Sequence, residues 1–150
     1  MRFYTVGARL ILGLVIAAGF LAFASVDQSQ AVSKYARVTL HVRECPADTG
    51  NLFGNCHDDP IANFDLGGCN SSGSCTEKGT GSNGNVRFGP RAGSNAFYVV
   101  DLTGYVGTYI YCSNDATKKV LIDGRQDDGD FAITTTRGNY YTCDWYILTD

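Results

Sequence analysis

Hydrophobic and polar residues alternate with a period of two through most of this chain, and no window repeats at the 3.6-residue period of an amphipathic helix. Residues 37–43 show the pattern most clearly, because Val38, Leu40 and Val42 fall on one face and polar or charged residues fall on the other. This is the pattern of a strand with one buried and one solvated face. The alternation therefore predicts an all-β chain.

Seven further segments have the same strand-like character and end at glycine, proline, asparagine or aspartate residues typical of turns. Seven or eight short strands with this punctuation predict a single β-sandwich. The last two strands, joined through Gly138 and Asn139, are expected to form a hairpin. Stretches 45–60 and 67–84 are rich in Gly, Asn, Asp and Ser and are expected to be loops. The seven segments are 61–66, with Ala62, Phe64 and Leu66 inward, 85–88, 96–102, 108–113, 118–122, 131–136 and 140–148.

The N-terminus has the features of a cleavable secretion signal. Arg2 and Arg9 supply positive charge, residues 10–23 form an apolar run short for a membrane span, and Ala22-Phe23-Ala24 fits a small-x-small cleavage site. We expect a signal peptide over 1–24, a flexible leader over 25–34 and the β-sandwich over 35–150. The sequence therefore predicts a secreted or cell-surface protein that has no stable membrane insertion once the signal is cleaved. An uncleaved signal that serves as an anchor is the alternative.

Six cysteines lie downstream of this signal, which predicts a disulfide framework. Two pairs of cysteines bracket the two long loops, and we expect each pair to form a disulfide that closes its own loop. The remaining two cysteines share the core-facing parity of their strands with Ile110 and Trp145, so a buried bridge is expected between them. The predicted pairs are Cys45 with Cys56, Cys69 with Cys75, and Cys112 with Cys143.

Charge and motifs exclude several classes of function. The net charge of −3 becomes about −5 without Arg2 and Arg9, and basic runs are absent, so nucleic acid is not an expected partner. No Cys-x-x-Cys occurs and the two histidines lack finger spacing, so no zinc or other metal site is expected. No Gly-x-Ser-x-Gly elbow or triad can be assembled, and His57-Asp58-Asp59 has the composition of a loop. We expect no cofactor and no catalytic residues.

The acidic segment 123–130 leaves one alternative open. Its aspartates could ligate calcium, but the spacing of an EF-hand loop is missing because no glutamate closes it. A solvated acidic turn is the preferred interpretation, with weak calcium binding as the alternative. A small secreted hydrolase or toxin-like effector that uses acidic loops is the alternative function. Converging carboxylates in one pocket would favour it.

Four tyrosines form the candidate binding face. Strand parity puts Tyr109 and Tyr111 opposite Cys112, and it puts Tyr140 and Tyr146 opposite Cys143. If the third bridge makes these strands neighbours, the four rings share the outer face of one sheet. Plain cross-strand packing is one explanation. The other is an exposed aromatic platform for a glycan or a partner protein.

Five short segments together resemble a known family. They are Val38-Thr-Leu-His-Val-Arg-Glu-Cys-Pro46, Cys56-His-Asp-Asp-Pro-Ile-Ala-Asn-Phe64, Gly84-Asn-Val-Arg-Phe88, Tyr109-Ile-Tyr-Cys-Ser113 and Cys143-Asp-Trp-Tyr146. The chain resembles the prealbumin-like (transthyretin-like) β-sandwich modules of bacterial exported and surface proteins, related to collagen-adhesin B-type repeats. The resemblance implies a non-catalytic stalk, spacer or binding module. Many such modules carry a Lys–Asn isopeptide bond, but this chain has Val42 or Arg43 where the lysine would fall, so we expect none.

Overall fold

A computed structural model of the chain describes residues 33–150 and contains nine strands and one short helix. The signal peptide expected over 1–24 and all but the end of the leader expected over 25–34 lie outside the described residues. In chain order the elements are β1 (Arg37–Pro46), α1 (Leu52–Cys56), β2 (Asp65–Cys69), β3 (Cys75–Gly79), β4 (Asn85–Phe88), β5 (Gly93–Val99), β6 (Gly107–Asn114), β7 (Val120–Gln126), β8 (Asp130–Thr135) and β9 (Tyr140–Thr149).

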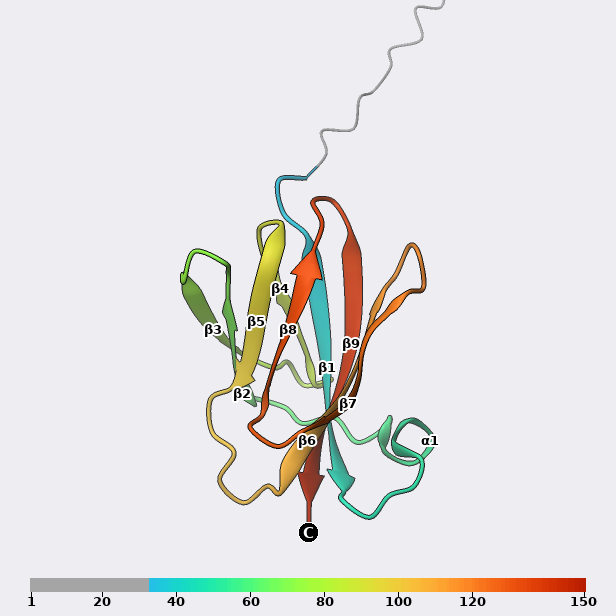
Figure 1. The fold of residues 1–150 in the computed structure, drawn as a ribbon. Coiled ribbons are helices and arrows are strands. Elements are labelled where there is room, and N and C mark those ends of the chain that lie inside the picture. The colour runs from blue at the N-terminus through green and yellow to red at the C-terminus, as the bar shows by residue number, and fades with distance from the viewer. Residues whose placement is uncertain (1–32) are drawn as a thin grey trace, which may run out of the picture.

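The strands form two sheets packed face to face (Figure 1). One sheet has five strands in the order β4-β1-β9-β6-β7, and the other has four in the order β3-β2-β5-β8. The predicted all-β sandwich is confirmed, with nine strands rather than seven or eight. The additional strand is β3, whose five residues are all exposed. Because neither face of β3 is buried, its sequence shows no alternation.

Strand β2 begins four residues later than the predicted segment 61–66, and Ala62, expected inward, is exposed. The strand continues through Gly67 and Gly68, which the sequence placed in a loop. Gly67 lies opposite Tyr98 of β5, and a Cβ at Gly67 would stand 1.9 Å from Cζ of that ring. The glycine is therefore required by cross-strand packing, and its presence does not mark a turn.

The expected hairpin between the last two strands is wrong. Strand β8 pairs with β5 in the four-stranded sheet, whereas β9 lies between β1 and β6 in the other sheet. The turn through Gly138 and Asn139 therefore crosses from one layer to the other. Both strands have one apolar face, which allows them either to pair side by side or to face each other across the core, and the turn residues do not distinguish the two.

A chain of four aromatic side chains joins the two sheets through the core. Phe88 meets Phe97 at 5.5 Å between ring centroids, Phe97 meets Phe131 at 5.2 Å, and Phe131 meets the single tryptophan, Trp145, edge-to-face at 5.0 Å. Phe88 and Trp145 come from the five-stranded sheet, and the other two come from the four-stranded sheet. Aromatic contacts of this geometry add to the free energy of area burial, so they hold the layers in one relative position.

Strands β1 and β9 set the shape of the domain. They pair in parallel over ten residues each, from Arg37 opposite Tyr140 to Pro46 opposite Thr149. Ten residues of strand extend about 33 Å. The described chain therefore enters at one end of the sandwich, called here the N-terminal pole, and finishes at the other, the C-terminal pole (Figure 1).

The expected absence of an isopeptide bond is testable by mass. Strand β1 contains no lysine, and Lys78 donates from Nζ to the backbone oxygen of Arg87 at 2.8 Å. We expect the intact mass of the reduced protein to equal the mass calculated from the sequence of the same residues. A deficit of one ammonia or one water would show that an amide bond forms between side chains and that this expectation is wrong.

Candidate functional site

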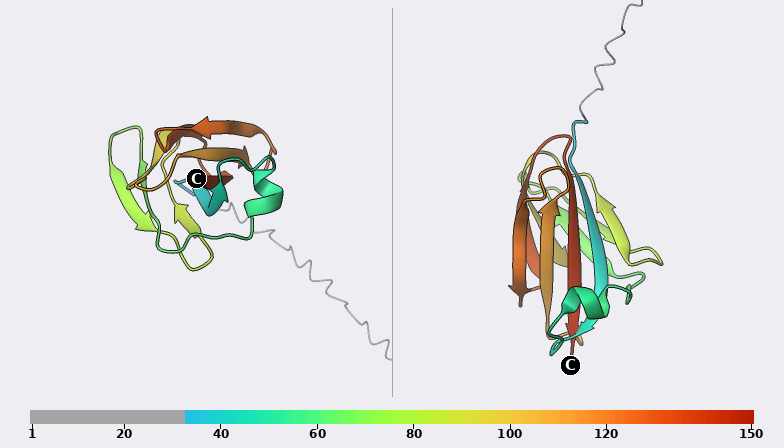
Figure 2. Two further views of the ribbon diagram at one scale, coloured as in Figure 1. Left: turned by 90° about the horizontal axis from the view of Figure 1, so that it is seen from below. Right: turned by 90° about the vertical axis from the view of Figure 1, so that its right-hand side faces the viewer.

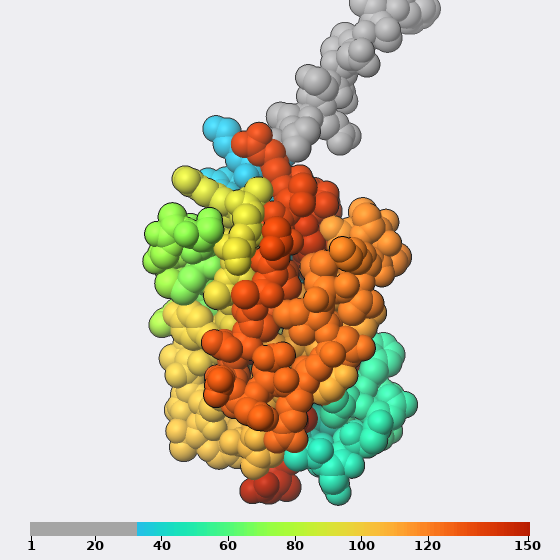
Figure 3. Space-filling model, viewed as in Figure 1, coloured from blue at the N-terminus to red at the C-terminus, as the bar shows by residue number. Residues whose placement is uncertain are grey.

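A disulfide-bonded loop covers part of the outer face of the five-stranded sheet. Cys45 is bonded to Cys56, which closes residues 45–56 into a loop that ends in helix α1. The side chain of Asn51 caps the helix by accepting a hydrogen bond from the backbone nitrogen of Gly54 at 3.0 Å. We call residues 47–56 the cap. Figure 2 shows α1 lying across the outside of the sheet near the C-terminus, and Figure 3 shows the same teal segment standing out beside the orange strands.

Under the cap lies a small hydrophobic cluster separate from the main core. It consists of Cys45, Cys56, Tyr146 and Leu148, with Leu52 and Tyr109 packed against it. Cys45 has the same strand parity as His41 and Arg43, so its sulfur leaves the outer face of β1 and can hold the cap there. The cluster explains how five helical residues stay docked, because a helix of this length is unstable alone.

The four predicted tyrosines do not form one platform. Tyr146 is 3% exposed beneath the cap, which contradicts its assignment to an exposed aromatic face. Tyr140 lies six residues from Tyr146 along β9, a distance of about 20 Å, and its ring lies under the guanidinium of Arg37 at 5.0 Å. Tyr109 and Tyr111 remain together on β6, where Tyr111 is 37% exposed.

A groove of about 560 Å³ lies between the cap and strand β7, and we call it the cap groove. Tyr109 and Tyr111 of β6 lie between its walls. Phe53, which is 64% exposed, stands on the cap side. Two smaller hollows of about 430 and 360 Å³ share Tyr35 and Phe88 at the N-terminal pole. The cap groove is lined by Ala47, residues 49–53, Tyr109, Tyr111, Asp123, Arg125, Asp144, Tyr146 and Leu148.

Polar groups in the cap groove are held by neighbours on the sheet. The Tyr109 hydroxyl donates to Asp123 Oδ1 at 2.5 Å, and this hydrogen bond, with a smaller effect of burial, raises the pKa of Tyr109. His41 Nδ1 lies 3.1 Å from Asp144 Oδ1. The Nε of Arg125 donates to Asp127 Oδ1 at 2.8 Å. The contacts with Tyr109 and His41 hold the carboxylates of Asp123 and Asp144 in place. Asp123 is nevertheless exposed, so a ligand can reach it.

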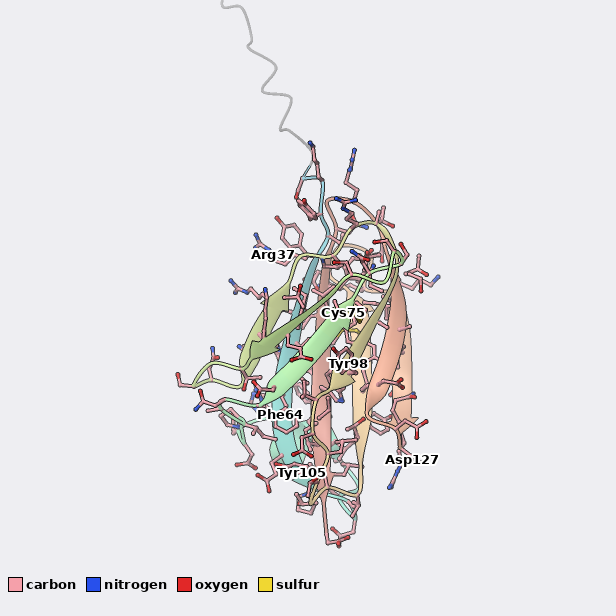
Figure 4. All side chains as sticks on the ribbon, turned by 90° about the vertical axis from the view of Figure 1, so that its left-hand side faces the viewer. Arg37, Phe64, Cys75, Tyr98, Tyr105 and Asp127 are labelled. Atoms are coloured by element: carbon pink, nitrogen blue, oxygen red, sulfur yellow. A yellow bond between two sulfur atoms is a disulfide. The ribbon has the colours of Figure 1, made fainter. Side chains whose placement is uncertain are left out.

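The acidic segment 123–130 is only in part the turn that its sequence suggested, because residues 127–129 form the turn between β7 and β8. Asp123 and Gly124 belong to β7, which runs to Gln126, so Asp123 is a strand residue in the cap groove. Asp127 pairs with Arg125 at the edge of the sheet (Figure 4). Within residues 33–150, no three His, Cys, Asp or Glu side chains are grouped closely enough to hold a metal ion. Calcium binding by this segment stays untested.

His57, Asp58 and Asp59 follow α1 directly. His57 Nδ1 lies 3.0 Å from Asp58 Oδ1, but the side chain of Asp58 is 90% exposed. The ring of His57 packs against Phe53 at 5.4 Å between centroids. The motif is therefore an exposed part of the loop behind the cap, in agreement with its loop-like composition.

Burial of Tyr146 predicts an alkaline loss of stability. Desolvation, with a smaller effect of Asp144, raises the pKa of Tyr146 from 10.0 to about 12. The unfolded chain then releases this proton at lower pH than the folded one, so the free energy of unfolding should fall by about 2 kcal/mol between pH 10 and 12. Urea unfolding across that range should show a shallower fall for Tyr146→Phe. A fall as steep in Tyr146→Phe as in the wild type would contradict the burial of Tyr146.

Sequence reasoning missed the cap and therefore the groove. It identified Tyr109 and Tyr111 and the Cys45–Cys56 loop, but it did not bring them together. One signal was present, since the parity of β1 places Cys45 on the polar face of its strand. That placement implies that the loop folds over the outside of the sheet. Asp123, Asp144 and Phe53 enter the site only through this docking.

No helix among the described residues is long and apolar enough to cross a membrane.

No protein-family model and no curated protein matches the sequence. Solved structures that resemble the fold include the pilus-presented adhesin Cpa, at 9% identity and a TM-score of 0.46 over 80% of this chain and 28% of that one. They also include the major pilin of Streptococcus pyogenes, at 10% identity and a TM-score of 0.43 over 77% of this chain and 48% of that one. A third is the Bacillus anthracis TIE protein, at 11% identity and a TM-score of 0.31 over 73% of this chain and 28% of that one. The chain spans less than half the length of each of these three proteins.

Proposed function

We propose that this protein is a secreted or cell-surface-associated, non-catalytic β-sandwich module of the prealbumin-like type that binds a ligand through the cap groove. The observation that carries the proposal is the exposure of Phe53 and Tyr111 along a groove of about 560 Å³. Aromatic side chains beside a concave surface with a few fixed polar groups are typical of recognition sites. The six cysteines, all paired, fit an oxidising location outside the cell.

The cost of building the groove supports a binding role. The cap uses a disulfide and buries Tyr146 and Leu148, yet it leaves Phe53 64% exposed. The contact of Phe53 with the His57 ring at 5.4 Å leaves most of this ring in water, where it can take part in a contact with a ligand. Contact with a ligand would cover that ring, and aromatic rings lose little conformational entropy when they are covered.

The position of the groove also fits a displayed module. Its residues Ala47 and Leu148 lie near the C-terminal ends of β1 and β9, at the C-terminal pole. The described chain begins at residue 33 and enters β1 at the N-terminal pole (Figure 1). A module held through its N-terminus would therefore present the groove away from the point of attachment.

A retention assay tests this function. The full secreted protein would be applied to surface material from the producing cells and from cells that they contact. We expect Phe53→Ser with Tyr111→Ser to reduce retention at least tenfold, since each ring supplies part of the anchoring contact. Tyr140→Ser is the matched control, because Tyr140 is exposed on the same sheet but outside the groove. Equal retention of all three proteins would contradict the proposal.

A further inference from the structure

We propose that the cap groove binds a lysine or arginine side chain of a partner protein, held over Tyr111 between Asp123 and Asp144. This inference rests on the proposed function and names the class of ligand. Three observations carry it: the position of the two carboxylates, the pairing of the groove's own cation, and the exposed rings.

The two carboxylates flank Tyr111 on the sheet. Tyr111 of β6 lies opposite Asp144 on β9 and opposite Asp123 on β7. Neighbouring strands lie about 4.8 Å apart, so the backbones that carry the two acids are separated by about 10 Å with the tyrosine midway. A cationic group placed over the ring would therefore have a carboxylate on each side.

The charges of the groove favour a cation. Arg125, the cation among the lining residues, donates through Nε to Asp127 at 2.8 Å and through Nη2 to the Val106 oxygen at 3.0 Å. Its charge is thus offset by a carboxylate outside the groove. Asp123 accepts from the hydroxyl of Tyr109, and Asp144 has the ring of His41 beside it. An incoming ammonium or guanidinium group would meet an excess of negative charge.

The aromatic rings add a second attraction for the same group. Tyr111 is 37% exposed and Phe53 is 64% exposed, and a cation over such rings is attracted by their negative faces. The protein already uses this interaction twice within its own structure. Arg37 lies over Tyr140 at 5.0 Å on the same face of the sheet, and Lys78 lies over Phe88 at 5.2 Å.

A peptide segment fits the groove better than a neutral sugar. Tyr109 and Tyr111 are two residues apart on β6, which places their side chains about 7 Å apart along the strand. Alternate side chains of an extended peptide have the same spacing, so a segment running along β6 can place one side chain on each ring. The hydroxyls of a neutral sugar could donate hydrogen bonds to the two carboxylates, but they supply no positive charge, and hydrogen bonds between two ionised groups are stronger.

The test uses the full secreted protein and a pentapeptide of acetyl-Gly-Lys-Gly-Lys-Gly-amide. Its counterparts contain arginine or the uncharged isostere norleucine in place of lysine. We expect the lysine and arginine peptides to bind at least tenfold more tightly than the norleucine peptide, with shifts in the amide NMR signals of Tyr111 and Asp123. Binding should weaken as salt is raised. Equal binding of the norleucine peptide would overturn the inference.

Variants then locate the charge. Asp123→Asn and Asp144→Asn keep the shape and an acceptor oxygen, and each should weaken lysine-peptide binding about tenfold. Asp128→Asn makes the same charge change at an exposed site outside the groove and should have no effect. Thermal unfolding would verify that all three remain folded. Unchanged binding by both groove variants would overturn the inference.

The retention assay separates this inference from the proposed function. If retention requires Phe53 and Tyr111 but neither basic peptide competes with it, the cationic ligand is wrong and the binding function stands. Competition by a neutral oligosaccharide would have the same meaning. If retention is independent of the groove, both proposals fail. Competition by the basic peptides, lost in Asp123→Asn, supports both.

Discussion

Replacing Cys112 and Cys143 together with alanine should destabilise the domain more than removing either of the other two disulfides. The bridges have sequence separations of 31, 11 and 6 residues for Cys112–Cys143, Cys45–Cys56 and Cys69–Cys75. The loop-entropy relation converts these separations into stabilisations of the folded state of about 4, 3 and 2 kcal/mol, in the same order. Cys112 and Cys143 are also completely buried between β6 and β9, so their removal opens the core as well.

Urea unfolding of the three pairwise alanine variants would measure this order. Cys112→Ser alone should be worse than the double alanine variant, because it leaves a hydroxyl and an unpaired thiol in a site that water does not reach. A larger loss for the Cys45 and Cys56 variant would contradict the ranking. It would mean that the cap contributes more to stability than the crosslink through the core.

Replacing Cys45 and Cys56 with alanine should weaken ligand retention strongly while the main core stays intact. Without the bridge, the packing of Leu52 against Tyr146 and Leu148 still holds α1 on the sheet, and the Nε of Arg43 still donates to the oxygen of His57 at 2.8 Å directly after the helix. The cap side of the groove, which carries Phe53, would then lose its covalent tie to the sheet that carries Tyr111. Retention should fall at least tenfold, with a loss of about 3 kcal/mol in the free energy of unfolding.

Trp145 fluorescence provides the control for that variant, because Trp145 is buried between the sheets and away from the cap. Its emission maximum should not change. Removing Cys69 and Cys75 is the matched comparison, since this bridge joins β2 and β3 outside the cap groove. That variant should retain ligand like the wild type. Full retention by the variant without the Cys45–Cys56 bridge would show that the cap does not form the site.

The sequence was sufficient for the features that depend on local patterns. Alternation placed Val38, Leu40 and Val42 in the core, where all three are completely buried. Parity also brought Cys112 opposite Cys143 on neighbouring strands, and loop bracketing gave the same other two pairs that the structure contains. Period-two patterns and short loop closures are properties of a few adjacent residues, so they can be read without knowledge of the whole fold.

The features that depend on tertiary docking could not be predicted. Strand β8 faces β9 across the core, where Phe131 meets Trp145, and such a contact between layers is not visible in any local pattern. Glycines suggested a loop at Gly67, but packing beneath Tyr98 makes them part of a strand. Tyr146 was assigned to the correct face and still proved buried, because the cap lies over it. Period-two parity identifies a face of a sheet and not what covers that face.

Protection of individual aromatic side chains is the most direct test that the cap groove binds the ligand. Hydroxyl-radical footprinting by mass spectrometry would compare the free protein with protein retained on surface material. We predict that Phe53 and Tyr111 become protected, while Tyr140 at 51% exposure and Tyr98 on the other sheet react as before. Protection of Tyr140 or Tyr98 with Phe53 and Tyr111 still reactive would contradict the account and place the binding surface elsewhere.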